Sequence, residues 1–262
     1  MSATALVLFF QVVTILGSAL TAFKLYSTGL SRRYRIFFAY LVFRVPYMTC
    51  AVLLDPKVRT GWRADAYLKF FIYSEPLVML FYVLVVFELY RLVLERYKGL
   101  YTLGRWAMYA AMSVAAGLSL VSFLRLAPSK PQPSSWMLFE VKAEARLDLA
   151  LALFILLIVW FLSRYPIQLN RNVLVHTGVY SVFFLSNTLV LLLWLFQINV
   201  IETVNKFLTG ITSLCGVAWW LLLSAKGEEV QVHAPALAPG SEQRILQQLD
   251  AINATLLKVS RN

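Results

Sequence analysis

The chain has 262 residues, of which 60% are hydrophobic and only 14% are charged. A soluble domain carries roughly 25% charged residues, and the mean hydropathy here is +0.70. These values exclude an ordinary soluble enzyme and favour a chain dissolved in lipid. The net charge of +11 comes from basic residues spread over short connections between apolar runs. This distribution favours anionic lipid headgroups as partners and argues against nucleic acid.

Seven apolar runs are each long enough to cross a bilayer, whose hydrocarbon core of about 30 Å needs roughly 20 helical residues. The predicted spans are residues 5–25, 36–54, 66–97, 104–124, 138–162, 173–196 and 204–224. We therefore predict an all-α polytopic membrane protein, with a seven-transmembrane-helix bundle over residues 1–225. A linker over residues 226–240 and a short amphipathic or coiled-coil helix over residues 241–262 would follow it.

The flanks of the first run decide between a cleaved signal peptide and a retained span. No basic residue precedes this run. Four follow it: Lys24, Arg32, Arg33 and Arg35. A signal peptide has its positive charges first, so this order favours a retained span with the N-terminus outside. We expect a multi-pass protein of the inner (plasma) membrane, with its C-terminus in the cytoplasm.

Ionisable residues inside the spans are the candidates for function, because each costs roughly 2.5 to 3.5 kcal/mol at a helix centre on insertion scales. Arg44 and Glu75 lie in the second and third runs, and alternating topology brings them to similar depths in the external half. We predict that they pair, directly or through water. Glu144 and Asp148 continue an acidic stripe that starts at Glu140 in the fifth run. The four residues Arg44, Glu75, Glu144 and Asp148 would form an external cleft for a cation, an amine or protons, the alternatives being a structural ion pair and solvated carboxylates.

A second polar cluster is expected at the cytoplasmic side, from Glu88, Arg171, Asn172 and His176. We expect His176 to be a packing residue hydrogen-bonded to Glu88 or to a backbone carbonyl, and a proton relay is the alternative. A b-type haem needs paired histidines and a zinc site needs three or four ligands, so a single histidine predicts neither a metal nor a cofactor. Catalytic and phosphate-binding motifs are absent from the sequence, and we expect no enzyme.

The C-terminal segment has the pattern of an interaction helix. Ser241 can cap it. Apolar side chains then recur at spacings of 4, 3, 4 and 3: Ile245, Leu249, Ile252, Leu256 and Val259. This seam predicts either an amphipathic helix lying on the bilayer or a helix that docks against a protein partner or a second copy, and both alternatives stay open.

A resemblance to one family rests on four segments: FFAYLVF at 37–43, SEPLVMLFYVLVVFELY at 74–90, LGRW at 103–106 and NRNVLVH at 170–176. In these segments the chain resembles uncharacterised seven-helix integral membrane proteins of acidobacterial genomes. The resemblance implies the seven-helix architecture and no established activity.

These features favour a non-enzymatic, receptor-like or scaffolding membrane protein, in which an external polar cleft is linked to a cytoplasmic partner-binding helix. The alternative is a transporter or channel for a small solute, an ion or protons. Such a protein would use the same buried charges, but it would not need the terminal seam.

Overall fold

Seven α-helices and one short strand pair make up the part of the chain that the computed structural model describes. The described residues are 3–54, 63–94, 102, 105–106, 109–110, 113, 133–164, 169–195, 201–229, 231–232, 247 and 250–251. The elements are α1 (Ala3–Ser27), the 3-10 turn η1 (Leu30–Arg32), α2 (Arg35–Leu54), α3 (Arg63–Val93), α5 (Pro133–Arg164), β1 (Leu169–Asn170), α6 (Arg171–Leu195), α7 (Ile201–Leu222), α8 (Lys226–Glu229) and β2 (Gln231–Val232).

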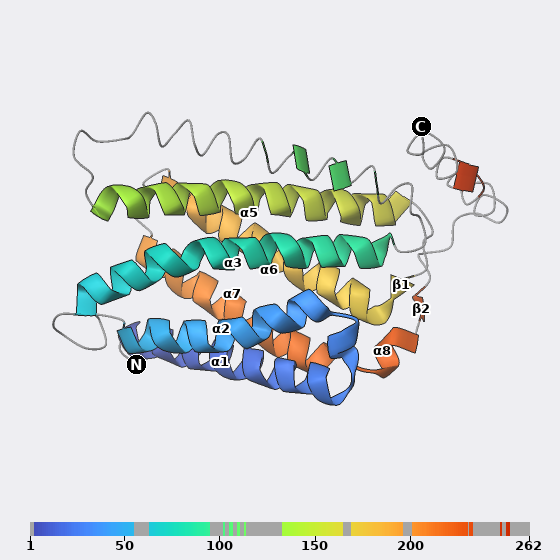
Figure 1. The fold of residues 1–262 in the computed structure, drawn as a ribbon, viewed down its shortest axis with the longest axis horizontal. Helices are drawn as coiled ribbons and strands as arrows, with labels where there is room; N and C mark the ends of the chain where they lie inside the picture. The colour runs from blue at the N-terminus through green and yellow to red at the C-terminus, as the bar shows by residue number, and fades with distance from the viewer. Residues whose placement is uncertain are drawn as a thin grey trace.

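The six long helices lie side by side along the long axis of the molecule (Figure 1). α1 contacts α7 and α2, while α6 lies between α5 and α7, and α3 joins α2 to α5. α8 and the antiparallel β1–β2 pair lie at the end of the bundle opposite the N-terminus (Figure 1). The chain therefore closes one end of the bundle with the segment that follows α7.

The helices lie where the apolar runs predict them. α1, α2, α6 and α7 each coincide with a predicted span to within a few residues, whereas most of the predicted span 104–124 falls outside the described residues. α5 begins earlier than expected, at Pro133, because proline has a backbone angle suited to the first helical turn and needs no partner for a missing N–H. Among the described residues, three helical segments are long and apolar enough to cross a membrane: Ala5–Ser27, Arg35–Leu54 and Lys69–Val93.

The distribution of side chains on α1 is the reverse of that in a water-soluble helix. Phe9, Leu16 and Phe23 are 55%, 55% and 70% exposed, whereas the polar Ser18 and Thr21 are each 1% exposed. Both hydroxyl groups donate to the carbonyl one turn earlier, which satisfies them without water. Large apolar side chains outside and polar ones inside favour lipid as the surroundings of this helix.

α1 and α7 approach each other through small residues. A Cβ atom added to Gly17 would lie 3.3 Å from the backbone carbonyl carbon of Gly216. One turn away, the hydroxyl oxygens of Thr14 and Ser213 are 2.8 Å apart. Close approach through glycine, supported by a hydroxyl bond across the contact, is a common way for helices to associate in lipid.

Replacing Gly17 with valine is expected to lower the unfolding free energy by about 1 to 3 kcal/mol, because the branched side chain must push α1 away from α7. The measurement is the midpoint of unfolding of the purified protein in mixed micelles with increasing dodecyl sulfate. Gly178→Val on α6 is the matched control, since a Cβ atom there meets nothing within 4 Å. Equal midpoints for the two variants would contradict the close contact.

The segment predicted as a linker, residues 226–240, begins with regular structure. α8 and β2 lie within it, with α8 packed against α6 and β1, and β2 paired with β1. In the register of the pair, Leu169 faces Val232 and Asn170 faces Gln231. The chain after α7 is therefore held to the start of α6 before it continues towards the C-terminus.

Candidate functional site

Three of the four residues predicted for the external cleft are buried in the interior of the bundle. Arg44 on α2, Glu75 on α3 and Asp148 on α5 are 6%, 4% and 0% exposed. Glu144, one turn before Asp148, is half-buried. Three different helices thus bring a basic and two acidic side chains into apolar surroundings. We call Arg44, Glu75 and Asp148 the polar centre.

The direct ion pair expected between Arg44 and Glu75 is not formed. Within the described part of the chain no carboxylate lies within 4.0 Å of the Arg44 nitrogens. The guanidinium carbon of Arg44 instead lies 5.5 Å from the ring centre of Tyr40 and 5.9 Å from that of Phe183. Tyr40 precedes Arg44 by one turn of the same helix, so its ring is within easy reach, and aromatic faces attract a desolvated cation. Glu75 accepts a hydrogen bond from the Tyr47 hydroxyl at 3.1 Å.

Asp148 is the least satisfied of these groups. Neither of its carboxylate oxygens has a hydrogen-bond partner in the described structure. Glu75 lies near enough to repel the Asp148 charge, and the amide side chain of Asn187 on α6 lies near enough to favour it. An isolated buried charge is costly, so Asp148 needs a proton, a cation or a ligand to neutralise it.

The structure separates the predicted cytoplasmic cluster into parts with different partners. Glu88 reaches from α3 to the start of α2, where its two carboxylate oxygens accept the N–H groups of Ile36 and Phe37, each at 2.9 Å. Among the described residues no hydrogen bond joins His176 to Glu88, which was one of the two partners expected for it. The first turn of a helix presents unpaired N–H groups and a positive dipole end, both of which attract a carboxylate.

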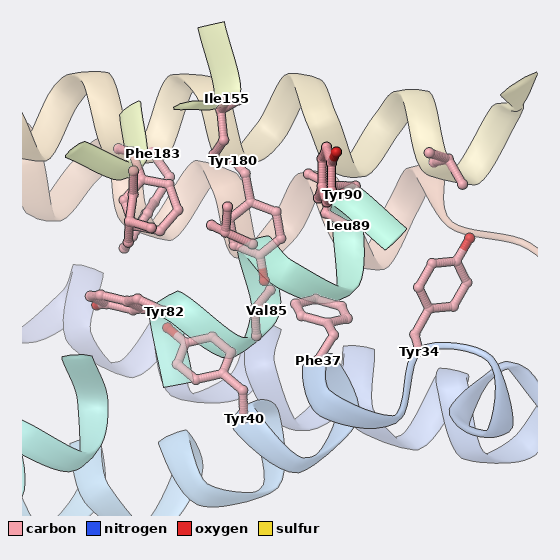
Figure 2. Close-up of a cluster of buried hydrophobic side chains, with 14 of the residues drawn as sticks. Tyr34, Phe37, Tyr40, Tyr82, Val85, Leu89, Tyr90, Ile155, Tyr180 and Phe183 are labelled. Carbon is pink, nitrogen blue, oxygen red and sulfur yellow. The ribbon is translucent and has the colours of Figure 1, made fainter. Parts of the chain in front are cut away.

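His176 packs among aromatic rings on the interior face of α6. Its ring centre lies 4.7 Å from that of Tyr34 and 4.6 Å from that of Phe37, and the side chain is 2% exposed. The packing role was predicted correctly, but its Nε2 atom has no hydrogen-bond partner in the described structure. The same is true of two neighbouring groups, the Tyr180 hydroxyl and Trp219 Nε1. Figure 2 shows Phe37 and Tyr180 in the interior of the bundle, with Tyr34 farther to the right.

Asn172 fastens the start of α6 to the end of α7. Its amide nitrogen donates to the Ser224 carbonyl at 2.8 Å, and its amide oxygen accepts the Ser224 N–H at 3.2 Å. A Cβ atom on Gly227 would collide with that amide oxygen, so any other residue there would have to displace the Asn172 side chain from these bonds. Arg171, the fourth predicted member of the cluster, is exposed and has no part in these bonds.

Glu228 on α8 is the residue that sequence reasoning missed. Its carboxylate accepts hydrogen bonds from the Tyr34 hydroxyl and, at 2.9 Å each, from the amide nitrogens of Asn170 and Asn172. Arg33 Nε lies 2.9 Å from the same carboxylate. Burial and the adjacent carboxylate raise the pKa of Tyr34 far above its ordinary value, so this hydroxyl remains a donor. We call this set of contacts the Glu228 joint.

The predicted partner-binding seam lies outside the described residues: Ile245, Leu249, Ile252, Leu256 and Val259. Three residues between its members, Gln247, Asp250 and Ala251, are helical and exposed. Over the described ranges, no three His, Cys, Asp or Glu side chains gather in a way that could hold a metal ion. The candidate site therefore consists of the polar centre, the His176 aromatic cluster and the Glu228 joint.

Comparison with protein-family models gives no match for this chain, and neither does comparison with curated proteins or with solved structures. The resemblance to seven-helix proteins of acidobacterial genomes thus remains an expectation from the sequence. A function has to be argued from the buried polar groups of this chain.

Proposed function

We propose that the chain is a receptor-like multi-pass membrane protein whose polar centre binds a small cationic ligand. The observation that carries the proposal is Asp148, which is fully buried and has two unpartnered carboxylate oxygens. A cation or an amine would supply the missing counter-charge. Arg44 does not supply it, because its guanidinium faces Tyr40 and Phe183.

The three apolar helices and the exposed apolar surface of α1 support a membrane location. We propose that α5, α6, α7 and the segment 104–124 complete seven crossings of the inner (plasma) membrane. The basic residues that follow the first span, Arg32, Arg33 and Arg35, support an external N-terminus. The polar centre would then lie in the external half, and the Glu228 joint would lie on the cytoplasmic side with the C-terminus.

The Glu228 joint supports the receptor-like or scaffolding reading. It holds the chain after α7 against α6, immediately before the segment in which we predict the partner-binding seam. A change in the tilt of α6, caused by a ligand beside Asn187, would be passed to Asn172 at the other end of the same helix. The proposed protein thus binds a ligand at one end of α6 and presents a docking helix at the other end.

The test is the unfolding temperature of the full-length protein in lipid nanodiscs with and without Na⁺, K⁺, choline or spermidine. A ligand at one hundred times its dissociation constant stabilises the folded state by about 2.7 kcal/mol, which is several degrees. We expect at least one of these cations to raise the unfolding temperature of the wild type and not that of Asp148→Asn. Glu75→Gln is expected to weaken the response.

Asp250→Asn is the matched control, because Asp250 is exposed near the C-terminus and the substitution changes the same charge away from the polar centre. It should keep the wild-type response. The proposal fails if none of the four cations stabilises the wild type, or if Asp148→Asn responds as the wild type does.

A further inference from the structure

Buried polar side chains recur along one face of α6. They are Asn172, His176, Tyr180 and Asn187, which are 0%, 2%, 2% and 8% exposed. Intervals of 4, 4 and 7 residues keep them on the same side of a helix. At 1.5 Å per residue they extend over about 22 Å, most of the thickness of a hydrocarbon core. An ionisable side chain inside a membrane bundle, such as His176, often marks a pathway for an ion or a proton.

α2 and the residue just before it present a second polar face to the first one. Its members are Tyr34, which precedes α2, and Tyr40, Arg44 and Tyr47 on α2, at intervals of six, four and three residues. The ring of Tyr34 lies 4.7 Å from that of His176, which joins the two faces at one end. Further along, the guanidinium of Arg44 lies 5.9 Å from the ring of Phe183, an apolar residue of α6 between Tyr180 and Asn187. Figure 2 shows Tyr180 reaching down from α6 into the space where Tyr40 rises from α2. We call the two faces together the polar file.

Carboxylates stand at both ends of the polar file. At one end the Tyr47 hydroxyl donates to Glu75, and Asp148 lies close by. At the other end the Tyr34 hydroxyl donates to Glu228. A carboxylate can accept a proton and release it again, so each end has a group that can take up or give up a proton.

The middle of the polar file contains buried groups without partners. They are His176 Nε2, the Tyr180 hydroxyl and Trp219 Nε1. The ring of Tyr180 lies 6.1 Å from that of His176 and 4.8 Å from that of Trp219. A buried polar group left without a partner costs about 1 to 3 kcal/mol. Imidazole and phenol are also the side chains that can accept one proton while giving up another.

We propose that the bundle conducts protons along the polar file, between the polar centre and the Glu228 joint. A proton taken up at Glu75 or Asp148 passes by way of Tyr180 and His176, and one proton leaves at Glu228 for each that enters. No other reactant is needed, but each transfer moves one positive charge across the membrane. Arg44 keeps its own proton, and its fixed charge opposes the passage of a hydrated metal cation. This activity goes beyond the proposed function, because it needs no bound ligand.

The experiment measures proton flux in vesicles of phosphatidylcholine and phosphatidylglycerol that contain the full-length protein and the pH-sensitive dye pyranine. A potassium gradient with valinomycin makes the interior negative and draws protons inwards. We expect the wild type to acidify the interior at least fivefold faster than protein-free vesicles do. His176→Phe should reduce this rate to the protein-free level, and Tyr180→Phe should slow it several-fold.

Tyr90→Phe is the matched control, since Tyr90 is a buried tyrosine of α3 that packs against Phe154 at 5.2 Å, away from the polar file. It should conduct as the wild type does. Circular dichroism and gel filtration show whether His176→Phe is folded. If it is not, Tyr180→Phe tests the proton path alone, because it removes only one oxygen atom. Wild-type flux equal to that of protein-free vesicles, or folded Tyr180→Phe with wild-type flux, would overturn the proposal. Potassium is present in both tests, whereas Na⁺, choline and spermidine enter only the ligand-binding test. Tyr180→Phe keeps the two proposals apart, because it is expected to slow the flux and leaves Asp148, on which ligand binding depends, unchanged.

Discussion

Replacing Glu228 with alanine is expected to detach α8 from the bundle and to lower the unfolding free energy by about 3 kcal/mol. The carboxylate accepts from Tyr34, Asn170 and Asn172, and Asn172 is 0% exposed, so its amide would lose a partner that water cannot replace. The ion pair to Arg33 contributes less, because Arg33 is 37% exposed and solvent screens it. Most of the effect is therefore expected from donors that become unsatisfied.

Hydrogen exchange at residues 223–232 and proteolysis of the folded protein in nanodiscs measure this loss. Exchange and cleavage should both speed up in Glu228→Ala, and by less in Glu228→Gln, which keeps one acceptor oxygen. Lys226→Ala is the control, because Lys226 is exposed on the same short helix. A Glu228→Ala protein that is cut no faster than Lys226→Ala would show that the joint does not hold this segment.

The positions of the long helices could be predicted from the sequence because the signal is local and large. Each apolar run sums the transfer free energy of about 20 neighbouring residues, so a few polar residues do not hide it. The same argument placed Arg44 and Glu75 inside the spans, and both are buried. For the acidic stripe that contains Asp148 the sequence left a cavity and solvent as alternatives, and the structure buries Asp148 fully. The position of a residue within an apolar run therefore predicts whether it lies inside the bundle.

The partners of these residues could not be predicted, because they depend on how each helix is rotated about its axis. The few polar side chains of α2 and α6 mark the face that turns inward, but they do not say which side chain of a neighbouring helix lies opposite each of them. Arg44 therefore turned out to face Tyr40 and Phe183, and Glu88 turned out to bind the start of α2 and not His176. Glu228 was missed for another reason. In a polar segment it resembles a solvated residue, and only the return of α8 to α6 brings its donors together.

Replacing Glu88 with alanine is expected to loosen the first turn of α2 and to lower the unfolding free energy by about 3 kcal/mol. The substitution leaves the N–H groups of Ile36 and Phe37 without acceptors in a partly buried site, and it removes a negative charge from the positive end of the helix. Unfolding in mixed micelles gives the free energy, and hydrogen exchange at residues 35–38 shows whether the loss begins there.

Two further variants separate the cap from the rest of α3. Glu88→Gln keeps one carbonyl oxygen for one of the two N–H groups, so it should lose about half as much stability. Arg91→Ala, on the exposed side of the same helix, should change both measurements far less, because its charge acts on the Glu88 carboxylate only through space and from an exposed position. The unfolding free energy is expected to rise in the order Glu88→Ala, Glu88→Gln, wild type only if the carboxylate caps α2. If amide hydrogens at residues 35–38 exchange no faster in Glu88→Ala than in Arg91→Ala, then Glu88 of α3 does not stabilise the first turn of α2. In that case Glu88 does not position Tyr34 and Phe37. The end of the polar file at Tyr34 is then held by the Glu228 joint alone.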